Sequence, residues 1–243
     1  MREYKYDLHI HSLLSPCGDD DNTPCNIAGM AHISEVDIVA LTDHNTCKNC
    51  PAFFEAAEAY GIIPVAGMEL TTSEDIHVVC LFEELRYALE FEKKLSEYRV
   101  LIKNRPDIFG EQVIMNSSDE VIGKEAFLLT NATLLSIEDV PSLVSEFHGV
   151  AYPAHIDKDA NGIIAVLGTF PETPSFSAAE LHDLTRADEY REKYSLADKL
   201  FLTGSDAHYL ENIGDCTGTV LLKAEKDDPS AVRRELIRKI GGL

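Results

Sequence analysis

The sequence predicts an α/β fold, and within that class a parallel barrel rather than an open dinucleotide-binding sheet. Short apolar segments typical of strands alternate with amphipathic segments typical of helices along the whole chain, which favours parallel βαβ units. The pattern indicates about seven or eight strands, and no glycine-rich phosphate loop accompanies them. Because no repeat or low-complexity linker interrupts residues 1–243, we expect a single domain.

The expected secondary structure follows the apolar pattern. Strands are expected where short apolar runs meet polar residues: 6–12, 38–45, 62–70, 76–82, 150–157, 177–183, 200–208 and 219–225. Helices are expected where apolar residues recur every three or four positions: 23–35, 51–61, 84–102, 136–149 and 228–242. Thr23–Pro24 and Asp228–Pro229 supply helix starts, and Gly61 supplies a helix stop.

Residues 104–133 depart from this alternation. Two short apolar runs flank the polar turn 116–120 there. We therefore expect a β-hairpin insertion within residues 104–133.

Composition limits the classes of function. Asp and Glu number 42 against 21 Lys and Arg, so the net charge is −21, and we expect no tight non-specific binding to nucleic acid. The first residues, MREYKYDLHIHS, lack the apolar core of a signal peptide, and no run reaches membrane-spanning length. We expect no membrane association, a cytoplasmic location and six reduced cysteines.

Six of the nine histidines lie in short polar motifs near strand ends. The motifs are DLHIHS, LTDHN, DIHVV, PAHID and GSDAH, and the histidines are His9, His11, His44, His77, His155 and His208. Carboxylates accompany them: Asp7, Asp43, Glu69, Asp157 and Asp206. We interpret each motif as the C-terminal end of a strand, which in a barrel is the face that carries active sites. The side chains are therefore expected to converge on one mouth.

A buried cluster of this kind requires partners for its polar atoms. Imidazole and carboxylate ligands together suit Zn, Mn or Fe. Several ions would neutralise the carboxylates and use the lone pairs of the imidazoles. We therefore expect divalent metal ions here, rather than six histidines that are satisfied separately.

The ordered motifs DLHIHS, LTDHN, GMEL with the following IHVV, PAHID and GSDAH resemble those of the PHP family (polymerase and histidinol phosphatase). The resemblance extends from Tyr6 to about Gly218. It implies a distorted (β/α)7 TIM-like barrel, two or three divalent metal ions (Zn, Mn or Fe) and hydrolysis of phosphoester bonds.

The resemblance also implies the ligands. One ion would be held by His9, His11, Glu69 and Asp206. Glu69 would bridge to a second ion, which the resemblance assigns to His77 and His155. His44 and His208 would hold a third ion with one ligand from the loop after the first strand. Asp7 and Asp43 would orient imidazoles.

The loop ligand is where this chain departs from the common pattern. Relatives often place an acid five residues after the second histidine, where this chain has Pro16. The loop SPCGDDDNTP is longer, and Asp19 is the favoured substitute. Cys17, Asp20 and Asp21 are alternatives, as is a solvated loop that holds no metal.

The implied mechanism is attack on phosphorus by a hydroxide that the metals generate from water. The metals would also neutralise charge on the phosphoryl oxygens. The implied catalytic residues are Glu69, Asp206 and His208, and the leaving oxygen receives its proton from a water, from Asp206 or from His208. The candidate contacts to substrate phosphate follow strand ends: Lys158, Arg186 and His182.

The leading hypothesis is a phosphoesterase that acts on a small phosphorylated metabolite, a nucleotide or a short oligonucleotide. One alternative is a non-catalytic or redox-regulated metal module, suggested by Cys47 and Cys50 in CKNC. We expect these two cysteines to be reduced thiols in a tight loop, because a lone CxxC is a weak metal signal. A proofreading-type nuclease is a further alternative, which the net charge disfavours.

Overall fold

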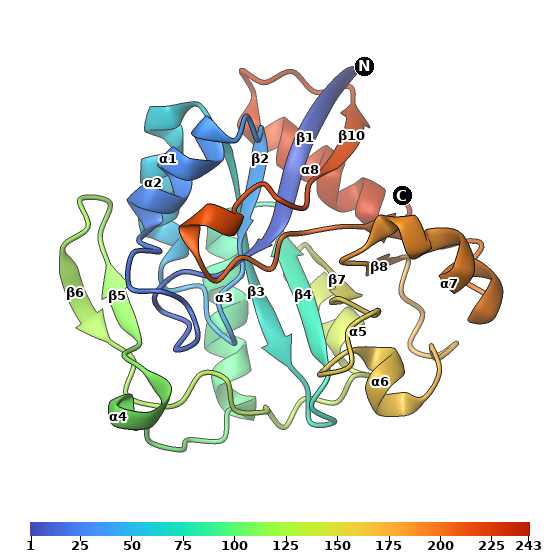
Figure 1. The fold of residues 1–243 in the computed structure, drawn as a ribbon, viewed down its shortest axis with the longest axis horizontal. Coiled ribbons are helices and arrows are strands. Elements are labelled where there is room, and N and C mark those ends of the chain that lie inside the picture. Colours follow the sequence, from blue (N-terminus) through green and yellow to red (C-terminus); the bar gives the residue numbers. More distant parts are fainter.

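A curled six-stranded sheet forms the centre of the protein (Figure 1). The computed structural model describes residues 1–243. In spatial order the strands are β10 (Gly218–Leu222), β1 (Arg2–Ile10), β2 (Ile38–Leu41), β3 (Ile63–Thr71), β4 (His77–Phe82) and β7 (Gly149–Pro153). The predicted α/β class is confirmed.

The strands of this sheet do not all run in the same direction. β1, β2 and β3 are parallel, whereas β10 is antiparallel to β1, and β4 is antiparallel to both β3 and β7. Only residues 72–76 join β3 to β4, which is too short for a helical crossover and therefore produces an antiparallel pair. The sheet is a half-barrel of mixed direction, and the expected (β/α)7 barrel is not confirmed in that exact form.

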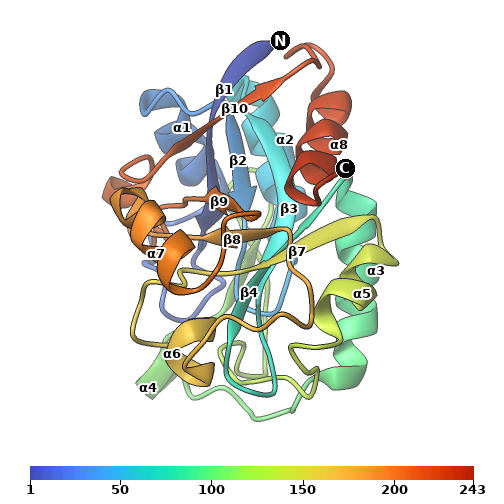
Figure 2. The same ribbon diagram turned by 90° about the vertical axis from the view of Figure 1, so that its right-hand side faces the viewer.

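Helices cover the sheet, as Figures 1 and 2 show from two directions. They are α1 (Pro24–Ile33), α2 (Cys50–Tyr60), α3 (Leu85–Leu95), α4 (Pro106–Phe109), α5 (Val140–Ser145), α6 (Ile163–Leu167), α7 (Ala187–Lys193) and α8 (Pro229–Ile240). Three short 3₁₀ helices are η1 (Ser96–Tyr98), η2 (Leu184–Arg186) and η3 (Leu210–Asn212). None of the helices has the length and apolar character that crossing a membrane requires.

The helix ends follow the signals in the sequence. Thr23 Oγ1 accepts a hydrogen bond from the amide of Asn26, and Asp228 Oδ1 accepts one from the amide of Ala231. Gly61 ends α2 in a left-handed conformation, with φ of 67°. The helix expected over 136–149 is shorter than predicted, because only 140–145 are helical.

Apolar side chains form two layers because residues alternate along the strands. Ile38 and Ala40 of β2 face the interior of the half-barrel, where they join Tyr6 and Leu8 of β1 and side chains of α8. Val39 and Leu41 belong to the outer layer, together with apolar residues of α1, α2, α3 and α5. α8 therefore fills the half-barrel from one end, and the other end of the strands is left for polar residues.

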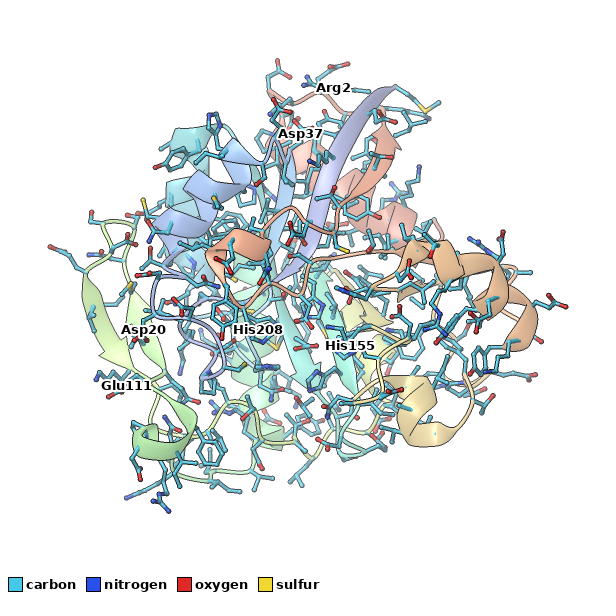
Figure 3. The ribbon with its side chains drawn as sticks, in the orientation of Figure 1. Arg2, Asp20, Asp37, Glu111, His155 and His208 are labelled. Carbon is cyan, nitrogen blue, oxygen red and sulfur yellow. The ribbon has the colours of Figure 1, made fainter.

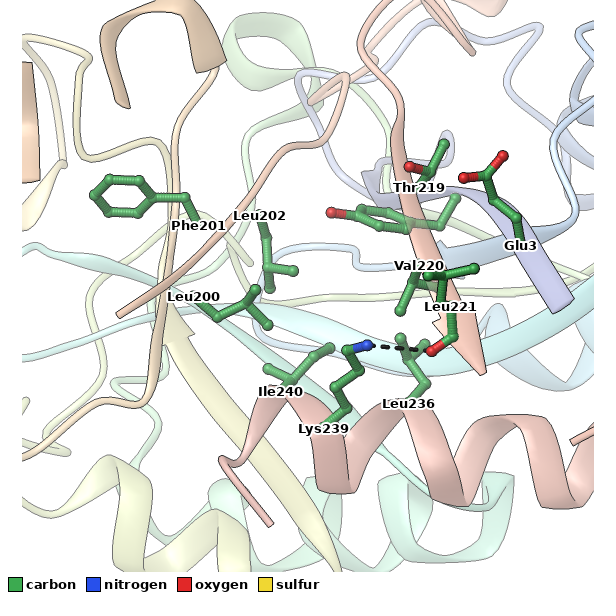
Figure 4. A pocket seen from close by; sticks show the side chains of 11 residues that line it. Glu3, Leu200, Phe201, Leu202, Thr219, Val220, Leu221, Leu236, Lys239 and Ile240 are labelled. Atoms are coloured by element: carbon green, nitrogen blue, oxygen red, sulfur yellow. Dashed lines mark hydrogen bonds between the residues drawn. The ribbon is translucent and has the colours of Figure 1, made fainter. Parts of the chain in front are cut away.

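The barrel is interrupted between β9 and β10. β8 (Ala178–Glu180) and β9 (Leu200–Leu202) are a parallel pair that is not hydrogen-bonded to the six-stranded sheet. A cavity of about 300 Å³ separates β9 from β10, and apolar side chains of α8 line it (Figure 4). At its rim, Lys239 Nζ donates a hydrogen bond to the carbonyl oxygen of Leu221 at 3.1 Å. None of the predicted site residues lines this cavity.

The predicted hairpin insertion is confirmed. β5 (Val113–Met115) and β6 (Val121–Lys124) are antiparallel, and residues 116–120 form the turn between them. Asn49 fastens the hairpin to the body of the protein, because its side chain accepts from the amide of Met115 and donates to the carbonyl of Val113. The side-chain amide of Asn49 also donates a hydrogen bond to Ser12 Oγ at 3.0 Å. The insertion is thereby tied to the loop after β1.

Gly67 in β3 provides a test of the packing between β3 and β4. A Cβ at this position would lie 2.6 Å from the Cys80 carbonyl oxygen and 2.7 Å from Leu81 Cδ2. Gly67→Ala is expected to lower the free energy of unfolding by about 3 kcal/mol, because the core has no room for the methyl group. The control is Gly61→Ala, where a Cβ meets nothing within 4 Å and the left-handed backbone costs about 1 kcal/mol. Urea unfolding followed by circular dichroism measures both, and equal losses would contradict this account.

Candidate metal centre

Polar side chains from several strands meet at one end of the sheet. They come from the ends of β1, β2, β3, β7 and β9 and from the start of β4: His9, His11, His44, Glu69, His77, His155, Asp206 and His208. The expectation that every motif lies at the C-terminal end of a strand is wrong for His77, the first residue of β4. Because β4 is antiparallel to β3, His77 pairs with Thr71 at the end of β3. Figure 3 shows His155 and His208 near the middle of the molecule and Arg2 at the far end of the strands.

Glu69 is at the centre of this cluster, and its side chain is only 1 % exposed. Its Oε1 lies 2.8 Å from His77 Nδ1, 3.0 Å from His155 Nε2 and 3.3 Å from His9 Nε2. Its Oε2 lies 3.1 Å from His44 Nδ1 and 3.4 Å from His11 Nε2. One buried carboxylate is thus shared by five imidazoles from four strands.

Asp206 is the second carboxylate of the cluster, on the side toward solvent. Its Oδ1 lies 3.3 Å from His11 Nε2, 3.5 Å from His9 Nε2 and 3.6 Å from His208 Nδ1. The side chain of His208 is 26 % exposed. Asp206 and His155 have positive φ angles of 50° and 27°, a conformation that costs about 1–3 kcal/mol for a residue with a side chain.

The donor set fits divalent metal ions. Three groups have ligand atoms within 4.8 Å of one another: His9–His11–Glu69–Asp206, His11–His44–His208 and His44–Glu69–His77. The Nδ1 atoms of His44, His77 and His155 are buried and make no hydrogen bond. Those of His44 and His77 lie within 3.1 Å of Glu69, but without the alignment of a hydrogen bond. Unpartnered imidazole nitrogens beside a shared carboxylate suit borderline divalent ions such as Zn, Mn or Fe.

Burial and the carboxylates act in opposite directions on the imidazoles. Burial lowers the pKa of His44 well below its ordinary value and that of His208 to about 4. Burial also opposes the charged form of His11, but hydrogen bonds to Asp206 and Glu69 raise its pKa to about 9. Burial would raise the pKa of Glu69, yet the imidazoles around it, His77 foremost, hold that pKa well below its usual range. The carboxylates therefore stay ionised and available to cations.

Asp43 supports the centre through serines rather than by touching an imidazole. Its carboxylate accepts from Ser12 N and Oγ at 2.8 and 2.7 Å and from Ser15 Oγ at 2.7 Å. Ser15 Oγ lies 3.0 Å from His11 Nδ1 and accepts from the amide of His44 at 3.1 Å. Because the Ser15 hydroxyl proton goes to Asp43, His11 Nδ1 must donate, so Nε2, which faces Glu69 and Asp206, is the nitrogen that would bind metal in place of its proton.

Asp7 does not contact an imidazole, although it was expected to orient one. Its carboxylate accepts from the amides of Ser205, His9 and Gly214 at 3.0, 3.4 and 3.4 Å, so it fixes backbone around β1. The imidazole of His9 is held by Glu180 instead.

Glu180, at the end of β8, is a site residue that sequence reasoning missed. It is 1 % exposed, and its two oxygens lie 3.0 and 3.1 Å from His9 Nδ1. It also accepts from the amide of His155 at 3.1 Å. The available signal was an acid inside the small apolar strand AAEL. Glu180 directs the Nε2 atom of His9 toward Glu69 and Asp206.

The loop after β1 does not bring an acid into the cluster. Asp19 Oδ1 accepts from the amide of Asp21 at 2.9 Å, and the amide of Asp19 donates to the carbonyl of His208. Asp19 belongs to none of the three ligand groups. Cys17 and Asp20 are exposed. The structure therefore places the favoured loop ligand beside His208, but with its carboxylate turned to its own loop.

The three residues predicted to contact substrate phosphate lie in different places relative to the cluster. Lys158 Nζ donates to Asp206 Oδ2 at 2.6 Å, at the edge of the cluster. Arg186 pairs with Glu189 instead, at 3.2 Å. His182 is exposed, and its amide donates to Asp157, whose carboxylate organises this loop rather than the cluster. Of the three, only Lys158 contacts a cluster residue.

Cys47 and Cys50 lie in the core beneath the centre. Both are 1 % exposed, and their Sγ atoms donate to the backbone carbonyls of Gly67 and Leu41 at 3.1 and 3.6 Å. Burial raises the pKa of Cys47 well above its ordinary value, and the neighbouring Cys50 adds to this. A buried thiol with a raised pKa, such as that of Cys47, is a poor nucleophile.

Known proteins resemble parts of this sequence and its fold. The model of the PHP domain matches residues 7–129. A 5'-3' exoribonuclease from Haemophilus influenzae is 31 % identical over 105 residues, which are 40 % of this chain and 37 % of the exoribonuclease. The lesion-specific endonuclease PfuEndoQ from Pyrococcus furiosus superposes with a TM-score of 0.65 at 17 % identity, over 100 % of this chain and 56 % of that one. This chain thus spans only part of the length of either nuclease.

A structure similar in size comes from Bifidobacterium adolescentis, and it is described as that of a proposed metal-dependent phosphoesterase. It superposes with a TM-score of 0.58 at 19 % identity and covers 96 % of each chain. At such identities the two structural matches show the fold alone. The match to the family model rests on the sequence itself and covers residues 7–129, which is more than half of the chain. The chain belongs to the PHP domain family.

The role of Glu180 is open to direct measurement. Glu180→Gln keeps the size of the side chain but removes the charge that holds His9 Nδ1. We expect the affinity for Mn²⁺ to fall about 10–100-fold, as for other groups that orient metal ligands. Titration calorimetry measures this, with Glu172→Gln on the surface as the control. An unchanged affinity in Glu180→Gln would show that the contact does not direct the imidazole.

Proposed function

We propose that the protein hydrolyses phosphoester bonds of a small phosphorylated metabolite, a nucleotide or a short oligonucleotide. The observation that carries the proposal is the buried Glu69, whose two oxygens lie within 3.4 Å of five imidazole nitrogens. Two or three divalent ions, Zn, Mn or Fe, are the cofactors that this donor set suits. Residues 1–243 are proposed to act as one domain, because α8 joins the layer that fills the half-barrel.

The ligands are proposed as the sequence motifs assign them. One ion is held by His9, His11, Glu69 and Asp206. Glu69 also contacts His77 and His155, the proposed partners for a second ion. His44 and His208 form a group with His11 that suits a third ion, and Asp19 would complete it only if its carboxylate turned away from the Asp21 amide. When bound, the ions supply Lewis acidity and an activated water.

The chain itself arranges the reaction around three residues. Glu69 fixes the imidazoles from four strands at one point, so that they need not reorganise when charge develops on phosphorus. Water forms the new bond to phosphorus, and the bond to the leaving oxygen breaks as that oxygen takes up a proton. Asp206 and His208 border the solvent side and are proposed to face the leaving group. The apolar layers beneath exclude bulk water from the other side of the cluster.

Nuclease activity is the second candidate, and the comparisons support it. The relative that shares 31 % identity is a 5'-3' exoribonuclease, and a protein of similar fold is an endonuclease. The expectation of a small substrate therefore widens to include nucleic-acid ends. The net charge of −21 still disfavours tight non-specific binding to long nucleic acid, so we favour nucleotides or short oligonucleotides.

The proposed function predicts activity that depends on Glu69. The protein loaded with Mn²⁺ is expected to hydrolyse members of a panel of phosphomonoesters, phosphodiesters and short oligonucleotides. Glu69→Gln is expected to lower kcat/KM by at least about 10³-fold, because removing a preorganised charge from the reaction centre costs several kcal/mol. Glu58→Gln on the exposed face of α2 is the surface control. No hydrolysis of any panel member by the metal-replete wild type would refute the proposal.

The redox-regulated alternative leads to a separate prediction. Because Cys47 and Cys50 are buried and donate to backbone carbonyls, Cys47→Ala/Cys50→Ala is expected to keep the metal content and the response to hydrogen peroxide of the wild type. Elemental analysis and phosphate-release assays measure these. A loss of peroxide sensitivity in the double variant would instead favour redox regulation.

A further inference from the structure

Among the lysines and arginines, Lys158 forms an ion pair with a residue of the cluster of imidazoles and carboxylates, Asp206. Its Nζ donates to Oδ2 of Asp206 at 2.6 Å, whereas Oδ1 of Asp206 faces His9 and His11 at 3.5 and 3.3 Å. The Lys158 side chain is 36 % exposed and that of Asp206 12 %. Asp206 therefore separates an inner side, where imidazoles converge, from an outer side that carries a positive charge.

The backbone around Lys158 is held firmly. The amide of Lys158 donates to the carbonyl of His155 at 2.9 Å. The carboxylate of the preceding Asp157 accepts from the amides of His182 and Asp183, both at 2.9 Å. The ammonium group is thus presented from a fixed loop between β7 and α6, next to a cluster residue.

Other basic side chains form ion pairs outside the cluster. Lys48 and Arg99 both pair with Glu125, and Arg186 pairs with Glu189. In a chain of net charge −21, an incoming phosphate meets few protein cations. Lys158 is therefore the protein group best placed to neutralise a phosphate that enters the cluster from solvent.

Phosphate esters differ in how many oxygens they can offer. A phosphomonoester has three non-bridging oxygens and close to two negative charges at neutral pH. A phosphodiester has two such oxygens and one charge, and the divalent ions compete for both. Once the divalent ions bind two non-bridging oxygens, only a monoester has a third such oxygen left for a positive group beside the metal centre.

We propose that Lys158 binds the third non-bridging oxygen of a terminal phosphate and makes the site selective for phosphomonoesters over phosphodiesters. This inference rests on the proposed phosphoesterase function and narrows it to substrates with a terminal phosphate, such as a nucleotide or a phosphorylated chain end. Lys158 leaves Asp206 Oδ2 for the phosphate, and Oδ1 stays on the inner side.

The test compares Lys158→Met with Lys158→Arg on a matched pair of esters, 4-nitrophenyl phosphate and bis(4-nitrophenyl) phosphate. In the Mn²⁺-loaded enzyme, Lys158→Met is expected to lower kcat/KM for the monoester about 30-fold, as for the loss of one charged hydrogen bond. The diester value is expected to change less than about threefold. Lys158→Arg is expected to recover most of the monoester activity. Lys48→Met is the matched control, because the Lys48 side chain is 37 % exposed and pairs outside the cluster.

A second measurement does not depend on turnover. The affinity of the metal-loaded protein for inorganic phosphate, measured by calorimetry, is expected to fall about tenfold or more in Lys158→Met and to stay unchanged in Lys48→Met. Metal content is determined in the same samples. Loss of metal in Lys158→Met would assign the residue a structural role through Asp206 and overturn the inference.

The remaining outcomes are equally decisive. An equal loss on the two esters, or unchanged phosphate affinity, overturns the selectivity. If the wild type hydrolyses neither ester nor any other phosphoester, the proposed function fails, and the phosphate titration alone then decides whether Lys158 binds phosphate.

Discussion

The burial of the Glu69 carboxylate is the constraint on which the rest of the centre depends. A carboxylate that is 1 % exposed would be far too costly without compensating positive charge. The chain supplies imidazoles from β1, from β4 and from the segments after β2 and β7. A nitrogen of each imidazole faces one of the two carboxylate oxygens of Glu69. Contacts behind the imidazoles, such as those of Ser15 with His11 and of Glu180 with His9, keep the rings directed at that carboxylate.

Strand direction decides how this convergence is achieved. Parallel β1, β2 and β3 bring the ends of three strands together, whereas antiparallel β4 contributes its beginning. Only residues 72–76 separate Glu69's strand from His77's strand, so two ligands that face each other arise from one tight connection. A fully parallel barrel would have carried the start of that strand, and His77 with it, to the opposite end.

The sequence predicted those features that depend on a few neighbouring residues. The HxH and DxH spacings with their apolar flanks were sufficient to predict the cluster. Two apolar runs around a polar turn predicted the hairpin insertion, and the Thr-Pro and Asp-Pro pairs predicted the helix starts at Thr23 and Asp228. The sequence was not sufficient for the direction of β4, which depends on pairing between distant segments, or for the gap between β9 and β10. Glu180 and Ser15 were missed because each resembles an ordinary strand or loop residue until the fold places it against an imidazole. Asp19 was chosen by counting along a loop, and counting does not reveal that its carboxylate accepts from its own turn.

The left-handed backbone at His155 and Asp206 has an evolutionary consequence. Gly adopts such angles with less strain than a residue with a side chain does, so a chain released from its function would gain stability by acquiring Gly at these two positions. Selection for stability alone would therefore erase these two side chains early. Their retention in a relative of this protein is then a marker that its centre is still in use, and their replacement by Gly indicates a descendant that has lost the centre.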